Sequence, residues 1–128
     1  MTKQHLPGPW VVSHNYAGAT FIESARPVRL NATTAGTPMV AEVYTHDDAE
    51  HFSGSANARL IAAAPDLLEA CQTFAEWLGR EDAGYQGERD TPEGECQWRE
   101  WYDENMRLCS LAQSQARAAL ARATGDES

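Results

Sequence analysis

Short runs of apolar and β-branched residues, separated by polar turn residues, make up the first third of the chain. Runs of this kind, broken by Gly, Pro, Asn and Thr, are typical of strands joined by tight connections. The pattern predicts four strands, at Trp10–His14, Ala19–Ser24, Val28–Ala32 and Met39–Tyr44. Because the connections are short, we expect these strands to pair as one antiparallel β-meander over residues 10–44.

A helical pattern follows the polar, acidic segment at residues 45–54. Ser55 can cap a helix, and the residues after it are strong helix formers. Proline disfavours helix at the residue before it but suits a first helical position, so we expect Pro65 to kink or restart a helix spanning residues 55–80. Spacings of three and four predict that one face of this helix is core, made of Leu67, Leu68, Cys71, Phe74, Ala75 and Leu78.

Another helix is predicted where Thr91, Pro92 and Glu93 combine a cap, a first-turn proline and an early acid. An apolar stripe then predicts helix over residues 92–123, with Trp98, Trp101, Tyr102, Leu108, Cys109, Ala112, Ala116, Ala119, Leu120 and Ala123 on it. About thirty helical residues extend roughly 45 Å, more than the diameter of so small a domain. The helix therefore either folds back as a hairpin or pairs with its copy in another subunit. We expect a homodimer through this C-terminal helix.

Chain length and composition complete the fold prediction. A chain of 128 residues with 42% hydrophobic and 23% charged residues has the size and make-up of one globular domain, residues 1–128. The predicted fold class is α+β, a four-stranded antiparallel β-meander followed by two to three α-helices, the last one long. The first ten residues lack the apolar segment of a signal peptide, and no run reaches the length of a membrane span, so we expect a soluble protein with no membrane partner. Three cysteines without a C-x-x-C spacing indicate reduced, buried thiols.

The net charge of −9 is concentrated in residues 76–104, which hold ten acids and three arginines. A field of this sign disfavours direct nucleic-acid binding and permits a protein partner with a basic surface. Aromatic residues, which are enriched at interface hot spots, interrupt these acids. The candidate partner-binding residues are Trp77, Tyr85, Arg89, Glu93, Glu95, Glu100, Trp101 and Asp103. The simpler alternative is a solvated acidic face, with the tryptophans of the helical stripe in the core.

Tyr85 and Arg89 also support a different hypothesis. Both lie in a Gly-rich loop with no packing period. An aromatic ring and a guanidinium can stack on and pair with an anionic planar ligand such as a small nucleotide.

Catalytic and metal-binding patterns are weak. His46, Asp47, Asp48 and His51 are metal-donor types, but their spacing matches no recognised metal motif. The sequence offers neither a G-x-S-x-G turn nor a nucleophile placed beside a histidine, and Ser55 is better explained as a helix cap. We therefore expect a non-enzymatic protein with no metal and no cofactor.

Three segments resemble small accessory proteins encoded by phages and prophages: Pro7–Trp10, Val40–Val43 and, most specifically, Asn57–Cys71. The resemblance covers roughly the first seventy residues and brings no activity with it. It implies a phage protein acting in the host cytoplasm, where proteins of this size often bind and disable host factors. We therefore hypothesise a non-enzymatic counter-defence protein that inhibits a host immune component by stoichiometric binding. The alternatives are a sponge for a nucleotide immune signal at a subunit interface, and a structural or regulatory phage protein.

Overall fold

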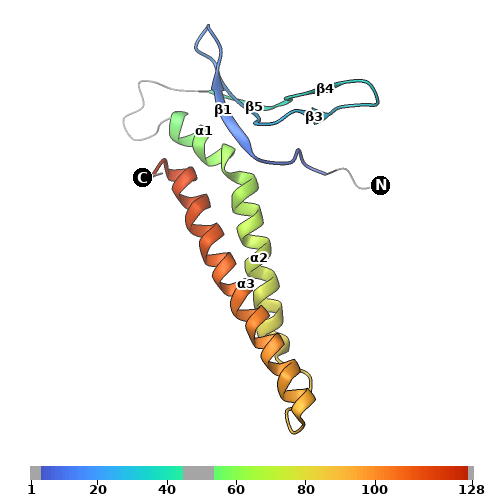
Figure 1. The fold of residues 1–128 in the computed structure, drawn as a ribbon. Coiled ribbons are helices and arrows are strands. Elements are labelled where there is room, and N and C mark those ends of the chain that lie inside the picture. Colours follow the sequence, from blue (N-terminus) through green and yellow to red (C-terminus); the bar gives the residue numbers. More distant parts are fainter. Residues whose placement is uncertain (1–3, 45–53, 127–128) are drawn as a thin grey trace.

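The computed structural model describes residues 4–44 and 54–126, which form a small β-sheet region at one end of a long helical hairpin (Figure 1). The elements in chain order are β1 (Trp10–His14), β2 (Thr20–Ser24), β3 (Val28–Arg29), β4 (Ala35–Gly36), β5 (Met39–Val43), α1 (Gly54–Ala62), α2 (Ala64–Ala83) and α3 (Pro92–Thr124). The α+β class and the long last helix are confirmed.

The main sheet has three antiparallel strands in the order β1-β2-β5, with β2 in the centre. Alternate residues of β2 point to one side, and Thr20, Ile22 and Ser24 are buried there. Ile22 pairs with Val12 on one side and Ala41 on the other, and it packs against Ala58 and Ala62 of α1. This contact joins the sheet to the helices.

The prediction of a single four-stranded meander is wrong. Strands β3 and β4 form a separate two-stranded hairpin, and β5 returns beside β2. The cause is Asn31, whose Oδ1 accepts hydrogen bonds from the backbone amides of Thr33 and Thr34, both at 3.0 Å. Such an Asx turn competes with extended backbone. The predicted third strand therefore ends at Arg29, and its last residues form the turn.

The predicted kinked helix over residues 55–80 is two helices. Helix α1 ends at Ala62, and α2 begins at Ala64 with Pro65 in its first turn. Proline has no backbone amide to donate, and the first turn of a helix does not need one. The expected restart at Pro65 is therefore correct.

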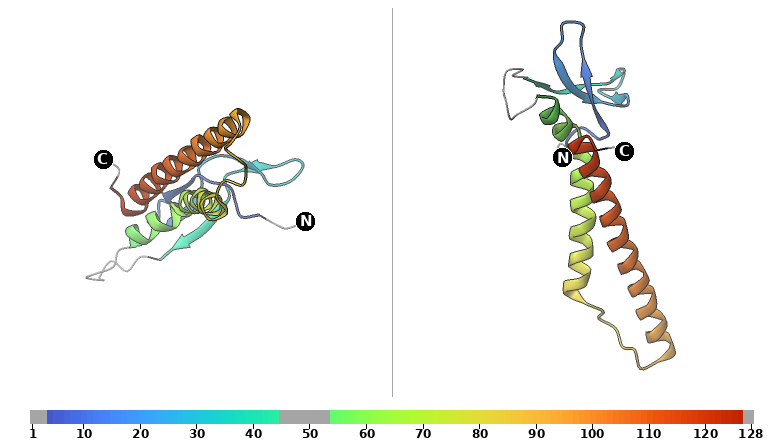
Figure 2. Two further views of the ribbon diagram at one scale, coloured as in Figure 1. Left: turned by 90° about the horizontal axis from the view of Figure 1, so that it is seen from below. Right: turned by 90° about the vertical axis from the view of Figure 1, so that its left-hand side faces the viewer.

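Helix α3 folds back antiparallel against α2, and the two run side by side for most of the length of α2 (Figures 1 and 2). Thr91 caps its start, since the Thr91 Oγ1 accepts a hydrogen bond from the Gly94 amide at 3.0 Å. Its end is marked by Gly125, which adopts a left-handed φ of 77°. The hairpin alternative for the long helix is thus realised within one chain.

Burial along the hairpin differs from the expected core. Leu68, Phe74 and Leu78 are 41%, 49% and 39% exposed, whereas the buried residue of α2 is Ala70. The thiols are free, but they are not buried as expected: Cys71 and Cys96 are exposed and Cys109 is half-buried. Among the described residues, the hairpin therefore carries large apolar side chains that are exposed.

Candidate functional site

The two long helices meet along one heptad-spaced stripe on each. The facing positions are Asp66, Ala70, Thr73, Trp77 and Arg80 on α2, and Trp101, Asn105, Leu108, Ala112, Gln115, Ala119 and Arg122 on α3. Alternating steps of three and four residues are the seam pattern of a coiled coil. Small residues, Ala70 among them, let the two helices approach closely in the half of the seam nearer the sheet.

Polar groups fix the axial alignment of α2 and α3 in the half of the seam nearer the loop at residues 84–91. The Arg80 guanidinium donates to the Trp101 carbonyl at 3.0 Å and to the Asn105 Oδ1 at 3.3 Å. The buried Asn105 amide donates in turn to Glu81. Because a buried amide without partners is destabilising, this network favours one axial alignment of α2 and α3.

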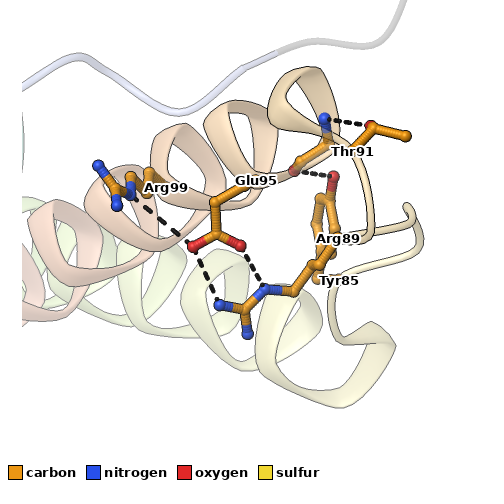
Figure 3. Close-up of polar contacts among 6 residues, drawn as sticks. Tyr85, Arg89, Thr91, Glu95 and Arg99 are labelled. Atoms are coloured by element: carbon orange, nitrogen blue, oxygen red, sulfur yellow. Dashed lines mark hydrogen bonds and ion pairs between the residues drawn. The ribbon is translucent and has the colours of Figure 1, made fainter.

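The loop at residues 84–91 forms the tip of the hairpin and is closed by its own side chains (Figure 3). Tyr85 donates its hydroxyl to the Gly94 carbonyl at 3.2 Å, and its ring lies 6.0 Å from that of Trp101. A Cβ added at Gly94 would collide with the Glu88 carbonyl group, so only glycine fits this crossing. The tip is therefore held against α3 by contacts of its own side chains and backbone.

Arg89 is held on two sides at the same tip. Its guanidinium forms a bidentate pair with Glu95, at 3.1 and 3.2 Å, and lies 3.6 Å from the centre of the Trp98 ring. The Arg89 hydrogen bond lowers the pKa of the Glu95 carboxyl below its ordinary value, with smaller contributions from the charges of Arg89 and Arg99. A nucleotide stacked between Tyr85 and Arg89 would have to displace these partners, and that hypothesis stays a prediction.

Acidic side chains occupy the positions just before the seam. Glu76 directly precedes Trp77 on α2, Glu100 and Glu104 directly precede Trp101 and Asn105 on α3, and Glu93 lies seven residues before Glu100. Asp103 lies two residues from the nearest seam positions, toward the outer edge of α3. On antiparallel right-handed helices, one step back from the seam rotates each helix to the same side of the hairpin. We call this side the acidic face, defined by Glu76, Glu93, Glu100 and Glu104, with Asp103 at its outer edge.

Charge interactions support the placement of both helices on this face. Glu104 pairs with Arg107 at 2.6 Å, and this hydrogen bond lowers the pKa of the Glu104 carboxyl. The same bond is the main reason why the pKa of Arg107 is raised, and the Glu76 carboxylate of α2 adds a smaller contribution. Glu76 thus lies close enough to α3 to share its field.

The eight predicted site residues do not form one surface. Three of them are engaged within the hairpin: Trp77 and Trp101 at the seam and Tyr85 at the tip. Two of them, Arg89 and Glu95, form the ion pair against Trp98. The remaining three are exposed: Glu93 and Glu100 lie on the acidic face and Asp103 at its outer edge. The predicted metal-donor loop, residues 46–51, lies outside the described residues.

The junction between sheet and hairpin was missed by the sequence interpretation. Arg122, near the end of α3, forms an ion pair with Asp66 and donates to the Trp10 carbonyl at 2.9 Å. Gly8 lies so close to Pro65 that an added Cβ would be 2.6 Å from the proline Cβ. The Gly-Pro-Trp and Pro-Asp segments that carry the phage resemblance therefore meet here, whereas no local pattern singled out Arg122.

A groove of about 430 Å³ lies beside this junction. It is lined by Val11, Val12, Arg59, Ala62, Arg122 and Gly125. Since Arg122 already holds Asp66 and the Trp10 carbonyl, we interpret the groove as part of the junction.

Comparison with known protein families matches residues 1–127 to the family described as Salmonella phage P22 protein Y8K6. The chain belongs to this phage protein family. The match covers the sheet, the junction and the whole hairpin, so the phage relationship expected from the Asn57–Cys71 helix extends over the region after Arg80 as well. No curated protein and no solved structure matches the chain. In the ranges 4–44 and 54–126, no helix has the length and apolar character needed to cross a membrane.

Proposed function

We propose that this phage protein acts without catalysis, by stoichiometric binding of a host protein with a basic surface through the acidic face of its hairpin. The observation that carries the proposal is the gathering of carboxylates from both α2 and α3 on one side of a hairpin fixed at both ends. The proposed place of action is the host cytoplasm, and the proposed class of target is a component of host immunity. The last two points rest on the phage family and the earlier resemblance.

The acidic face has the electrostatics that such binding needs. Glu93, Glu100 and Asp103 are exposed, and the described part of the chain provides no ion-pair partner for them. Unpaired surface carboxylates attract a basic partner over roughly 10 Å at moderate ionic strength and raise its rate of association. Binding through this face should therefore weaken steeply with salt.

The hairpin also gives the face a fixed shape. The Arg80 network holds the lower half in register, and the Tyr85 and Arg89 contacts close the tip. A surface that is already ordered before binding loses little conformational entropy on binding. The face is thus suited to rigid docking against another folded protein.

The test compares two variants with the same change in net charge. The face variant carries Glu76→Gln, Glu93→Gln, Glu100→Gln and Asp103→Asn. The control variant carries Glu42→Gln, Asp82→Asn, Glu88→Gln and Asp90→Asn, all at exposed positions off the acidic face. A host protein captured by the wild type at low salt should be captured equally by the control and lost by the face variant.

Two measurements then decide the proposal. The affinity of the purified host protein should fall for the face variant mainly through its association rate, and phage plating on a defended host should fall in parallel. Equal capture by both variants would remove the acidic face from the proposal. Normal plating of the face variant, with capture lost, would remove the counter-defence role alone.

A further inference from the structure

The described chain buries few large apolar side chains. Ile22 is the only large side chain of the described residues that is fully buried, and the hairpin seam consists mainly of small or polar residues. The exposed large apolar side chains of α2 and α3 are Leu68, Phe74, Leu78, Tyr102, Met106, Leu111 and Leu120. So small a core is unusual for a chain of 128 residues, because a chain of this size can bury about two-thirds of its surface.

Most of these exposed side chains occupy positions just after the seam. The exposed ones at these positions are Phe74 and Leu78 on α2 and Tyr102, Met106 and Leu120 on α3. The same stripes also carry Leu67 and Cys71 on α2 and Cys109 and Ala116 on α3, of which Leu67, Cys109 and Ala116 are half-buried. One step forward from the seam rotates the two antiparallel helices to the same side, opposite the acidic face. These nine residues define the apolar face of the hairpin.

The spacing on α3 repeats that of its seam. Tyr102, Met106, Cys109, Gln113, Ala116, Leu120 and Ala123 alternate steps of four and three, as the residues facing α2 do. A second heptad stripe beside the first is what a helix needs to pack against two neighbours at once. None of the seven side chains is charged.

We propose that a second copy of this chain covers the apolar face, so that two hairpins form a four-helix bundle. A second copy presents the same face with the same heptad spacing, as a two-fold symmetric interface requires. The face is uncharged from Leu67 to Leu78 on α2 and from Tyr102 to Ala123 on α3, and Glu81, next along α2, accepts a hydrogen bond from Asn105. Gln113 is the one amide on the α3 stripe, and a single polar group in such a seam selects one register. The acidic faces of both copies then remain outside.

The area of the face fits a stable dimer. The 20 residues of α2 rise about 30 Å, and two packed helices are about 20 Å wide. The flat projected area of the face is therefore about 600 Å² on each copy, and the uneven surface of the side chains adds to it. Stable interfaces bury roughly 600–1,000 Å² per partner, so this area reaches the lower end of that range.

Two leucines on α3 provide a matched test. Leu120, 55% exposed, lies on the apolar face, and Leu111, 38% exposed, lies on the opposite side of the same helix. Sedimentation equilibrium of the full chain should give the mass of a dimer for the wild type and for Leu111→Lys. Leu120→Lys should raise the dimer dissociation constant by about a hundredfold or more, since each dimer would bury two unpaired ammonium groups.

A third variant tests whether α2 takes part. Phe74→Lys should weaken the dimer as Leu120→Lys does, because the apolar face of each copy includes Phe74, an exposed residue of α2. A dimer that resists Phe74→Lys but not Leu120→Lys would run through α3 alone and overturn the four-helix bundle. A wild type that stays monomeric at high concentration, or a dimer that resists both substitutions, would overturn the proposal entirely.

The dimer and the proposed host binding fail independently. Far-UV circular dichroism should show native helix content for each lysine variant, since the substituted positions are exposed in the single chain. The charge-neutralised face variant keeps the apolar face and should remain dimeric. Leu120→Lys keeps every carboxylate of the acidic face, so host binding by its monomer tests that face alone.

Discussion

Replacement of Arg122 by methionine should separate the contribution of the junction from that of the rest of the fold. Arg122→Met keeps an unbranched, largely apolar side chain and removes the guanidinium. It deletes the 2.9 Å hydrogen bond to the Trp10 carbonyl and the ion pair with Asp66. The first of these ties β1 to the last turns of α3, and the second ties the start of α2 to the same place.

The size of the effect follows from burial and charge. A hydrogen bond from a charged donor contributes roughly 1.5–3 kcal/mol. The Arg122 and Asp66 side chains are 32% and 31% exposed, so solvent screens their ion pair and we assign it about 0.5–1 kcal/mol. The free energy of unfolding should therefore fall by about 2–4 kcal/mol. This is a large part of the roughly 5–15 kcal/mol expected for a domain.

Urea unfolding followed by circular dichroism, at one fixed protein concentration, measures this loss. The double-mutant cycle with Asp66→Asn should return a coupling energy near 1 kcal/mol, because the two single variants remove the same ion pair. A loss below about 0.5 kcal/mol for Arg122→Met, the range of ordinary surface substitutions, would show that the junction does not hold the sheet to the hairpin.

Two predictions concern the tip of the hairpin. Gly94→Ala should lower the free energy of unfolding by about 1–3 kcal/mol or more, since the new Cβ collides with the Glu88 carbonyl, and an alanine variant as stable as the wild type would contradict the described loop crossing. The Arg89 hydrogen bond holds the pKa of Glu95 below its ordinary value of 4.5, so the stabilisation that this pair provides is present above that pH and is lost as the pH falls through the folded-state pKa. Acid titration of stability should therefore show a smaller decline for Glu95→Gln than for the wild type, and identical curves would remove this pair as a cause.

Residues that begin or end helices made the helix boundaries predictable from the sequence. Pro65 ends one helix and starts the next, and Thr91 with Pro92 begins α3, because caps and prolines act on the backbone of their own few residues. Some of the short strands were also predicted correctly, because the turn residues between them likewise act locally. The strand at residues 28–32 was too long because the side chain of Asn31 closes a turn that propensity alone did not reveal.

Periodicity located the apolar positions of the hairpin but did not identify the face that is buried. Leu67, Phe74 and Leu78 lie one residue beyond the seam positions, which corresponds to about 100° around a helix. The merged stripe on α3 held two adjacent heptad stripes, and only the three-dimensional pairing separates the one with Leu108 from the one with Leu120. The acidic face was invisible for the same reason, since its members were counted together with acids of the tip.

The bond between Arg122 and Trp10 spans 112 residues and bears on how the protein folds during synthesis. Strand β1 leaves the ribosome roughly 5–20 seconds before its anchor at ordinary translation rates. Until α3 is complete, the sheet packs against α1 without the hydrogen bond between Arg122 and Trp10. Because the two residues are far apart in sequence, forming their contact adds a loop-closure entropy cost to the folding barrier. The nascent N-terminal strands are therefore not held by α3 until its last turns are synthesised. A ribosome that stalls late in α3 would leave these strands exposed to chaperones or proteases.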